Sequence, residues 1–157
     1  MNRSLRKPFA SSLSITLILG SAVVIGIGGS SDVTLVTAQK SAKVMREFHG
    51  VKLGMKSEQV QAAVGKPETK SETSEEYKLT GDDTLTVHYD GGVVKAMLLY
   101  FVDAKNAPPW NEVVGNAEVK VNDNGAKVAR VEVSEEKFWV SMYQNKSGTM
   151  TTITISR

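Results

Sequence analysis

Apolar and polar residues alternate with a period of two at 75–80 and again at 83–90, a pattern typical of strands with one buried face. The DGG motif at 90–92 then favours a tight turn, because glycine accepts the positive φ that hairpin turns require. In the run that follows, 93–102, the even-numbered positions are all apolar and the odd-numbered ones nearly so. We expect this run to be a strand covered on both faces at the centre of a sheet.

Short segments with helical spacing precede these strands. In GMKSEQVQAAVGKPE (54–68), Ser57 is placed to cap a helix, and Gly65 and Pro67 are typical of its end. A helix of about eight residues is marginal alone, so it needs a sheet to pack on. The spacing of apolar residues in QKSAKVMREFHG (39–50) predicts another short helix.

The same order of features returns in the last third of the chain. PPWNEVVGNAE (108–118) favours a helix start at its prolines, with Trp110 as the anchor into the core. Alternating segments and NDNG and NKSG turns follow. AAVGKPE aligns with EVVGNAE fifty positions later, and LTVHYDGG aligns with FWVSMYQNKSG. This periodicity favours a tandem repeat, with chance similarity between two strand meanders as the alternative.

The first 38 residues have the features of an export signal. Arg3, Arg6 and Lys7 precede an uncharged stretch at 11–28, and VTAQ (36–39) offers small residues for cleavage. The apolar stretch is also close to the length of about 20 residues that spans a membrane, so an uncleaved anchor is the alternative. In both cases we expect the remainder to be exported, periplasmic or extracellular.

Charge and composition exclude several classes of function. Removing residues 1–38 leaves 16 basic and 16 acidic residues, so the basic pI of the whole chain does not indicate a nucleic-acid partner. The small acidic cluster of Glu75, Glu76, Asp82 and Asp83 is expected to be a solvated strand end. The chain has no cysteine, which excludes disulfides, thiolate metal sites and a lipid anchor on cysteine.

We find no pattern of catalytic residues in the sequence. His49 and His88 are the two histidines, and no HxH or HExxH spacing supports a metal site. No serine lies in a GxSxG elbow, and no glycine-rich loop has a strand–loop–helix context. We therefore expect no enzyme activity, cofactor or metal. An enzyme with an unrecognised site is the weakest alternative.

Part of the chain resembles a known envelope family. LGMKSEQVQAAVGKPE, the aromatic Tyr77 and LTVHYDGGVVKAM together resemble the SmpA/OmlA (BamE-like) domain over 51–102. With the second unit, the chain also looks like the tandem architecture of β-lactamase inhibitory protein (BLIP-like). These resemblances imply noncatalytic protein binding or scaffolding in the cell envelope. The lipid-anchor cysteine of the outer-membrane assembly lipoproteins is absent, and no inhibitory loop matches.

The candidate partner-binding residues are aromatic residues on strands. In KFWVSMY (137–143), alternation points Phe138 to the helix side, which leaves Trp139 and Tyr143 on the other face. Exposed Trp and Tyr favour a binding hot spot, and a second core layer is the alternative. Tyr100 and Phe101 on the predicted central strand leave the same two alternatives open.

These observations predict an α+β fold in which two short-helix plus antiparallel-sheet units share one layer of helices over a twisted sheet. The expected organisation is a leader at 1–38, a first unit at 39–103 and a second, repeat-like unit at 104–157. We expect an exported, noncatalytic module that binds an envelope protein. The alternative is a carrier of a small apolar ligand or lipid in a groove between helices and sheet.

Overall fold

The computed structural model describes residues 43–157, which belong to one compact unit. The predicted signal or anchor at 1–38, and the first residues of the helix predicted at 39–50, lie outside the described residues.

The described chain forms one eight-stranded antiparallel sheet, with two short α-helices and a separate two-stranded hairpin. The sheet order is β3-β4-β5-β6-β10-β9-β8-β7. The strands of this sheet are β3 (Thr69–Lys70), β4 (Ser74–Lys78), β5 (Thr84–Asp90), β6 (Val93–Phe101), β7 (Lys120–Val121), β8 (Lys127–Val133), β9 (Phe138–Gln144) and β10 (Thr151–Ser156). The predicted mixed α+β class is confirmed, and antiparallel β-structure dominates it.

The two middle strands of the sheet are β6 and β10, which pair with each other across the two parts of the chain. The central position predicted for the 93–102 run is therefore confirmed, but the cover predicted on both of its faces is wrong, because Tyr100 is 40% exposed. The turn from β5 into β6 has the predicted glycine geometry, with φ of 59° at Gly91 and 78° at Gly92. The two strands of this sheet that have only two residues, β3 and β7, lie at its edges, where short strands offer little to an incoming strand.

A β-bulge changes which residues of β6 share a face. Tyr89 pairs with Val94 and His88 pairs with Ala96, so Lys95 is the extra residue. Because of this bulge, Val94 and Met97 both lie in the core, each fully buried. The predicted grouping of Val94 with the even-numbered residues of the strand is therefore wrong.

Helices α1 (Ser57–Val64) and α2 (Trp110–Val113) pack on the core through apolar residues. Val60 and Val113 are fully buried, and Trp110 packs against the core as predicted. Helix α1 ends at Gly65, whose φ of 90° suits glycine. A short 3₁₀ helix, η1 (Ala104–Asn106), follows β6.

The helix predicted at 39–50 is wrong for its described part. Residues 43–46 have no regular structure, and β1 (Glu47–Phe48) pairs with β2 (Val51–Lys52). His49 and Gly50 have φ of 48° and 80°, a turn that a helix cannot contain. Phe48 packs edge-to-face on Phe101, so tertiary contacts outweigh the helical spacing here.

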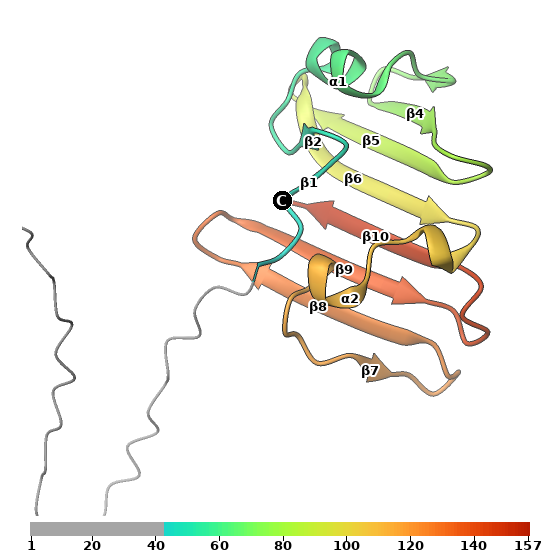
Figure 1. Cartoon of the computed structure of the whole chain (residues 1–157). Helices are drawn as coiled ribbons and strands as arrows, with labels where there is room; N and C mark the ends of the chain where they lie inside the picture. Colours follow the sequence, from blue (N-terminus) through green and yellow to red (C-terminus); the bar gives the residue numbers. More distant parts are fainter. Residues whose placement is uncertain (1–42) are drawn as a thin grey trace, which may run out of the picture. The chain divides into compact units, whose positions relative to one another are not determined.

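One hydrophobic core joins both parts of the chain. Its residues come from the hairpin, both helices and the strands on either side of the β6–β10 pair. The helices and the β1–β2 hairpin lie in front of the sheet in Figure 1 and cover one of its faces. We call the other surface the open face: the side chains of β4, β5, β6, β10, β9 and β8 that point away from this core.

Candidate functional site

The open face consists of alternate residues of six strands, which the strand register aligns into rows. Directly opposed residues on antiparallel strands have neighbouring side chains on the same face. We name the rows after one member each. From β4 to β8, the tyrosine row is Lys78, Thr84, Tyr100, Thr152, Tyr143 and Val128. The leucine row is Glu76, Thr86, Leu98, Thr154, Ser141 and Arg130. The tryptophan row is Ser74, His88, Ala96, Ser156, Trp139 and Glu132.

The middle of this surface is uncharged. On β5, β6, β10 and β9 the three rows contain hydroxyl, aromatic and apolar side chains together with one histidine, and the charged members of the rows are on β4 and β8. Beyond the tryptophan row, the exposed Asp90 of β5 and Lys95 of β6 place charge at one end of this surface. Tyr100 is 40% exposed and Val102, just beyond β6, is 47% exposed. An uncharged centre with a charged rim is typical of protein-binding surfaces.

The predicted aromatic candidates divide between the two faces. Trp139, Tyr143 and Tyr100 all lie on the open face, and Phe138 lies in the core as alternation predicted. Phe101 is only 3% exposed and belongs to the core, so it is removed from the candidate binding residues. Its neighbour Tyr100 points the opposite way because successive strand residues alternate.

Trp139 has a fixed cationic neighbour. The Arg130 guanidinium lies 4.1 Å from the centre of the Trp139 ring and makes a 3.1 Å ion pair with Glu132. A cation over an indole is attracted by the negative face of the ring, so this contact orders the rim of the open face next to β8.

Two histidines were candidates for chemistry. His88 is exposed on the open face, whereas His49 lies in the β1–β2 turn, on the covered side, with its ring 4.2 Å from that of Phe48. The fold therefore separates them. Within residues 43–157 there is no group of three or more His, Cys, Asp or Glu side chains that could hold a metal ion.

A buried carboxylate on the covered face was missed by sequence reasoning. Glu75, predicted in a solvated acidic cluster, is 1% exposed, because it shares the inward face of β4 with Tyr77. Asp83 of the same cluster is also buried and accepts hydrogen bonds from Val102 N and Asn106 Nδ2, both at 2.8 Å. The period-two alternation that buries Tyr77 was the signal that could have located Glu75.

Donors from four elements surround the Glu75 carboxylate. The predicted cap residue, Ser57, makes no capping bond, and its hydroxyl donates to Glu75 instead. The donors to Oε1 are Ser57 Oγ at 2.6 Å, Gln61 Nε2 at 2.8 Å and Lys70 Nζ at 2.7 Å. The donors to Oε2 are Tyr77 OH at 2.6 Å and Tyr89 OH at 2.5 Å.

These contacts decide the protonation of the cluster. Burial alone would raise the pKa of Glu75, but the hydrogen bonds from Lys70, Ser57 and the two tyrosines outweigh it and hold that pKa well below its ordinary value. Burial and the neighbouring carboxylate raise the pKa of Tyr77 and of Tyr89 far above the ordinary value. The cluster is therefore one carboxylate surrounded by protonated donors.

The geometry of the Glu75 cluster supports structure rather than catalysis. Lys70 Nζ lies 3.2 Å from Ser57 Oγ, within the hydrogen-bond reach that a nucleophile and its base require. Here the ammonium and the hydroxyl both donate to Glu75, so neither a free base nor an activated oxygen results. The cluster joins α1 to β3, β4 and β5.

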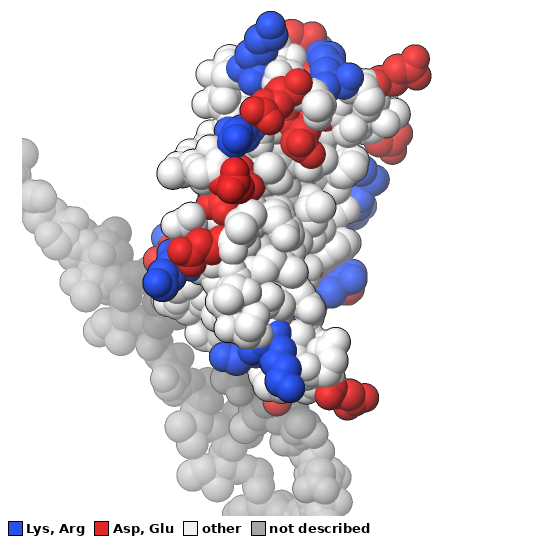
Figure 2. Space-filling view, turned by 90° about the vertical axis from the view of Figure 1, so that its right-hand side faces the viewer, with Lys and Arg blue, Asp and Glu red and all other residues white. Residues whose placement is uncertain are grey.

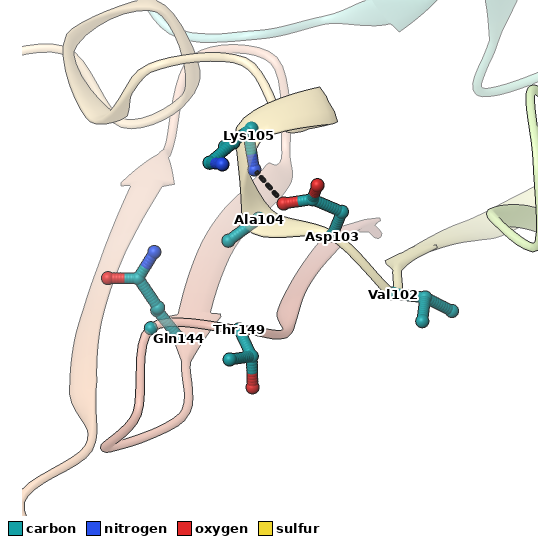
Figure 3. A pocket seen from close by; sticks show the side chains of 7 residues that line it. Val102, Asp103, Ala104, Lys105, Gln144 and Thr149 are labelled. Carbon is teal, nitrogen blue, oxygen red and sulfur yellow. Dashed lines mark hydrogen bonds between the residues drawn. The ribbon is translucent and has the colours of Figure 1, made fainter.

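The depression beside the β9–β10 hairpin brings together few groups that could react. The depression in Figure 3 measures about 520 Å³, is open to solvent, and lies between the end of β6 and the β9–β10 hairpin. Asp103 accepts a 3.0 Å bond from the Lys105 backbone N–H and so caps η1, and Gln144 and Thr149 complete the polar lining. Nucleophile and base are not paired in this depression.

Charge on the end of the sheet is mixed. Figure 2 shows basic and acidic side chains interspersed among uncharged residues, without a field of one sign over the visible surface.

Of the helices described, none has the length and apolar character needed to cross a membrane.

No protein-family model, curated protein or solved structure matches this chain.

Proposed function

We propose that this chain is an exported, noncatalytic protein-binding or scaffold module of the bacterial cell envelope, and that it binds its partner through the open face. The observation that carries this proposal is the uncharged part of the open face that the three rows form on the four middle strands, with Tyr100, Tyr143 and Trp139 on it. Large rings contribute contact area at low entropic cost, and hot spots are enriched in Trp and Tyr.

The finer architecture is part of the same proposal. Two helix-plus-meander units, 39–103 and 104–157, join through the β6–β10 pair, and each places its last strand at the middle of the sheet. An internal repeat is supported by the order of elements in the two units. It is also supported by Gly65 and Gly115, which align after the two helices and both have a positive φ. This arrangement is what a tandem SmpA/OmlA-like protein would have.

The location in the envelope rests on the sequence of the first 38 residues. Cell fractionation combined with N-terminal sequencing of the exported protein tests it directly. Recovery of the chain outside the inner membrane, starting near residue 39, is the expected result. Retention in the cytoplasm would remove the envelope from the proposal.

The carrier hypothesis requires a cavity between helices and sheet. That space is occupied by core side chains, among them the fully buried Val60, Leu85 and Met97. A ligand placed there would have to displace the core, so the open face is the better candidate.

Site-specific photo-crosslinking in cells that produce the full chain tests the binding function. A photoreactive phenylalanine analogue at Tyr143 samples the open face, and the same analogue at the exposed Ala62 of α1 is the matched control. The proposal predicts a discrete protein adduct from position 143 and none of that size from position 62. Identical adducts from both positions, or none from 143, would contradict it.

A further inference from the structure

We propose that the protein bound by the open face is a second copy of this chain, docked face to face about a two-fold axis parallel to the strands between β6 and β10. This inference rests on the proposed function and names its partner. The two copies would form a sandwich of two sheets about 10 Å apart, with the helices outside.

The order of strands makes the open face compatible with itself. A two-fold rotation about an axis along the strands exchanges the two sides of the sheet and keeps each row at its height. Therefore β6 lies over β10 of the second copy, β5 over its β9, and β4 over its β8. Interfaces with this symmetry use the same surface on both subunits.

Side-chain sizes match in this arrangement. Tyr100 faces Thr152 of the second copy, and Tyr143 faces Thr84 in the same row. In the leucine row Leu98 faces Thr154. In these two rows large residues lie opposite small ones, which allows the two sheets to interdigitate as in the core of a sandwich. In the tryptophan row Ala96 faces Ser156 of the second copy, and Trp139 faces His88, so two aromatic rings pack against each other there.

The rim charges select this axis. Glu76 and Arg130 are the ends of the leucine row, on β4 and β8. With the axis along the strands, Glu76 of each copy faces Arg130 of the other, and two ion pairs form. With an axis across the strands, Glu76 would face Glu76 and Arg130 would face Arg130, which places like charges together.

Sheet twist does not prevent these ion pairs. Aligned sheets cross at about 30°, which displaces residues on β4, about 12 Å from the axis, by roughly 6 Å relative to their partners. Glutamate and arginine side chains are long enough to span that shift, provided that the Arg130 guanidinium turns from Glu132 and the Trp139 ring toward Glu76 of the second copy. The middle strands, close to the axis, keep their partners.

The size of the surface predicts the strength of the dimer. Six strands about 4.8 Å apart and rows about 7 Å apart give roughly 600 Å² per copy, or about 1,200 Å² in total. This is the lower end of the range for specific interfaces, so we expect a dissociation constant of about 1–50 μM.

The test uses sedimentation equilibrium of the protein purified from cells that express the full chain, at about 1–100 μM, a range that brackets this constant. Glu76→Arg and Arg130→Glu should each weaken the dimer at least tenfold, and the double exchange should restore it to within about threefold. Glu58→Arg, an exposed charge change on α1, is the matched control and should leave the dissociation constant of the dimer unchanged. Thr154→Arg places a charge in the middle of the open face and should abolish the dimer.

The outcomes separate this inference from the proposed function. A monomer at every concentration, together with a crosslink from Tyr143 to another protein, would overturn the dimer and leave the binding function standing. A dimer that ignores all the exchanges would place self-association elsewhere and also overturn the inference. A monomer without any crosslink from Tyr143 would overturn both.

Discussion

The two faces of the same strands differ in what their residues do. On the covered face, alternate residues are fully buried and pack with the helices, and the buried polar groups of Glu75 and Asp83 are satisfied by hydrogen bonds. On the open face, the residues between them are hydroxyl, aromatic or apolar in the middle, and charges lie at the rim. Alternation therefore places stability and recognition on neighbouring residues of one strand, where they can be separated by mutation.

The largest expected effect is at Glu75. Glu75→Gln removes the charge that five donors share, and breaking a buried ionic cluster in this way should reduce the free energy of unfolding by about 3–5 kcal/mol. The control is Glu76→Gln at the next residue, which lies on the open face. This substitution should change the free energy of unfolding of the monomer by less than about 0.5 kcal/mol. Urea unfolding of the two variants measures the difference. Equal losses would mean that Glu75 is not the anchor of α1.

Two neighbouring leucines allow the two faces to be compared through uncharged residues. Leu99 is fully buried, and Leu98 is on the open face. Leu99→Ala should cost about 3 kcal/mol through lost burial and the cavity left behind, and Leu98→Ala less than about 1 kcal/mol in the monomer. Thermal unfolding at low protein concentration compares them. Similar costs would show that Leu98 is buried as well.

Acid should weaken the covered face selectively. The folded state keeps Glu75 ionised because its pKa is held low, whereas the unfolded chain takes up a proton near pH 4.3. The stability that Glu75 contributes is present above the unfolded pKa and is lost as pH falls through the folded one. Between pH 5 and pH 3 the wild type should lose about 1.5 kcal/mol more than Glu75→Gln.

Urea unfolding of the wild type and of Glu75→Gln is measured from pH 5 to pH 3, and the difference between their free energies of unfolding is compared at each pH. The contribution of the other carboxylates cancels in this difference. A constant difference from pH 5 to pH 3 would show that the pKa of Glu75 is not lowered by folding.

The smallest effect on stability is expected on the open face. Tyr143→Ala should change the free energy of unfolding by about 0.5 kcal/mol or less in the monomer, because the ring is half-buried and has no core contact. The same variant should lose the binding function. A loss above about 2 kcal/mol in dilute protein would make Tyr143 part of a core layer instead.

The sequence was sufficient for the features that depend on local pattern. Period-two alternation predicted the long strands and the faces of Phe138, Trp139 and Tyr143, and the glycines at 91 and 92 predicted the central hairpin. These predictions succeed because the pattern and the turn geometry act over a few residues.

Features that depend on tertiary contacts could not be obtained in this way. The pairing of β6 with β10 joins residues 50 to 60 positions apart, from Thr151 with Phe101 to Ser156 with Ala96. The bulge at Lys95 appears only once β5 and β6 are in register. Glu75 was assigned to solvent by its charge, because its five donors come from separate elements. Residues 43–50 form no helix because the contact between Phe48 and Phe101 decides their conformation.

The absence of cysteine from the sequence allows a direct measurement of whether the open face is covered in cells. Thr154→Cys in the middle of that face and Ala62→Cys on α1 each introduce a single thiol that a maleimide can label. Labelling rates are compared between intact cells and purified protein diluted to about 0.1 μM, tenfold below the lower limit of the expected dissociation constant. We predict that the thiol at position 154 reacts at least tenfold more slowly in cells than when dilute, while the two rates at position 62 agree. Equal ratios at the two positions would contradict the claim that the open face is an interaction surface.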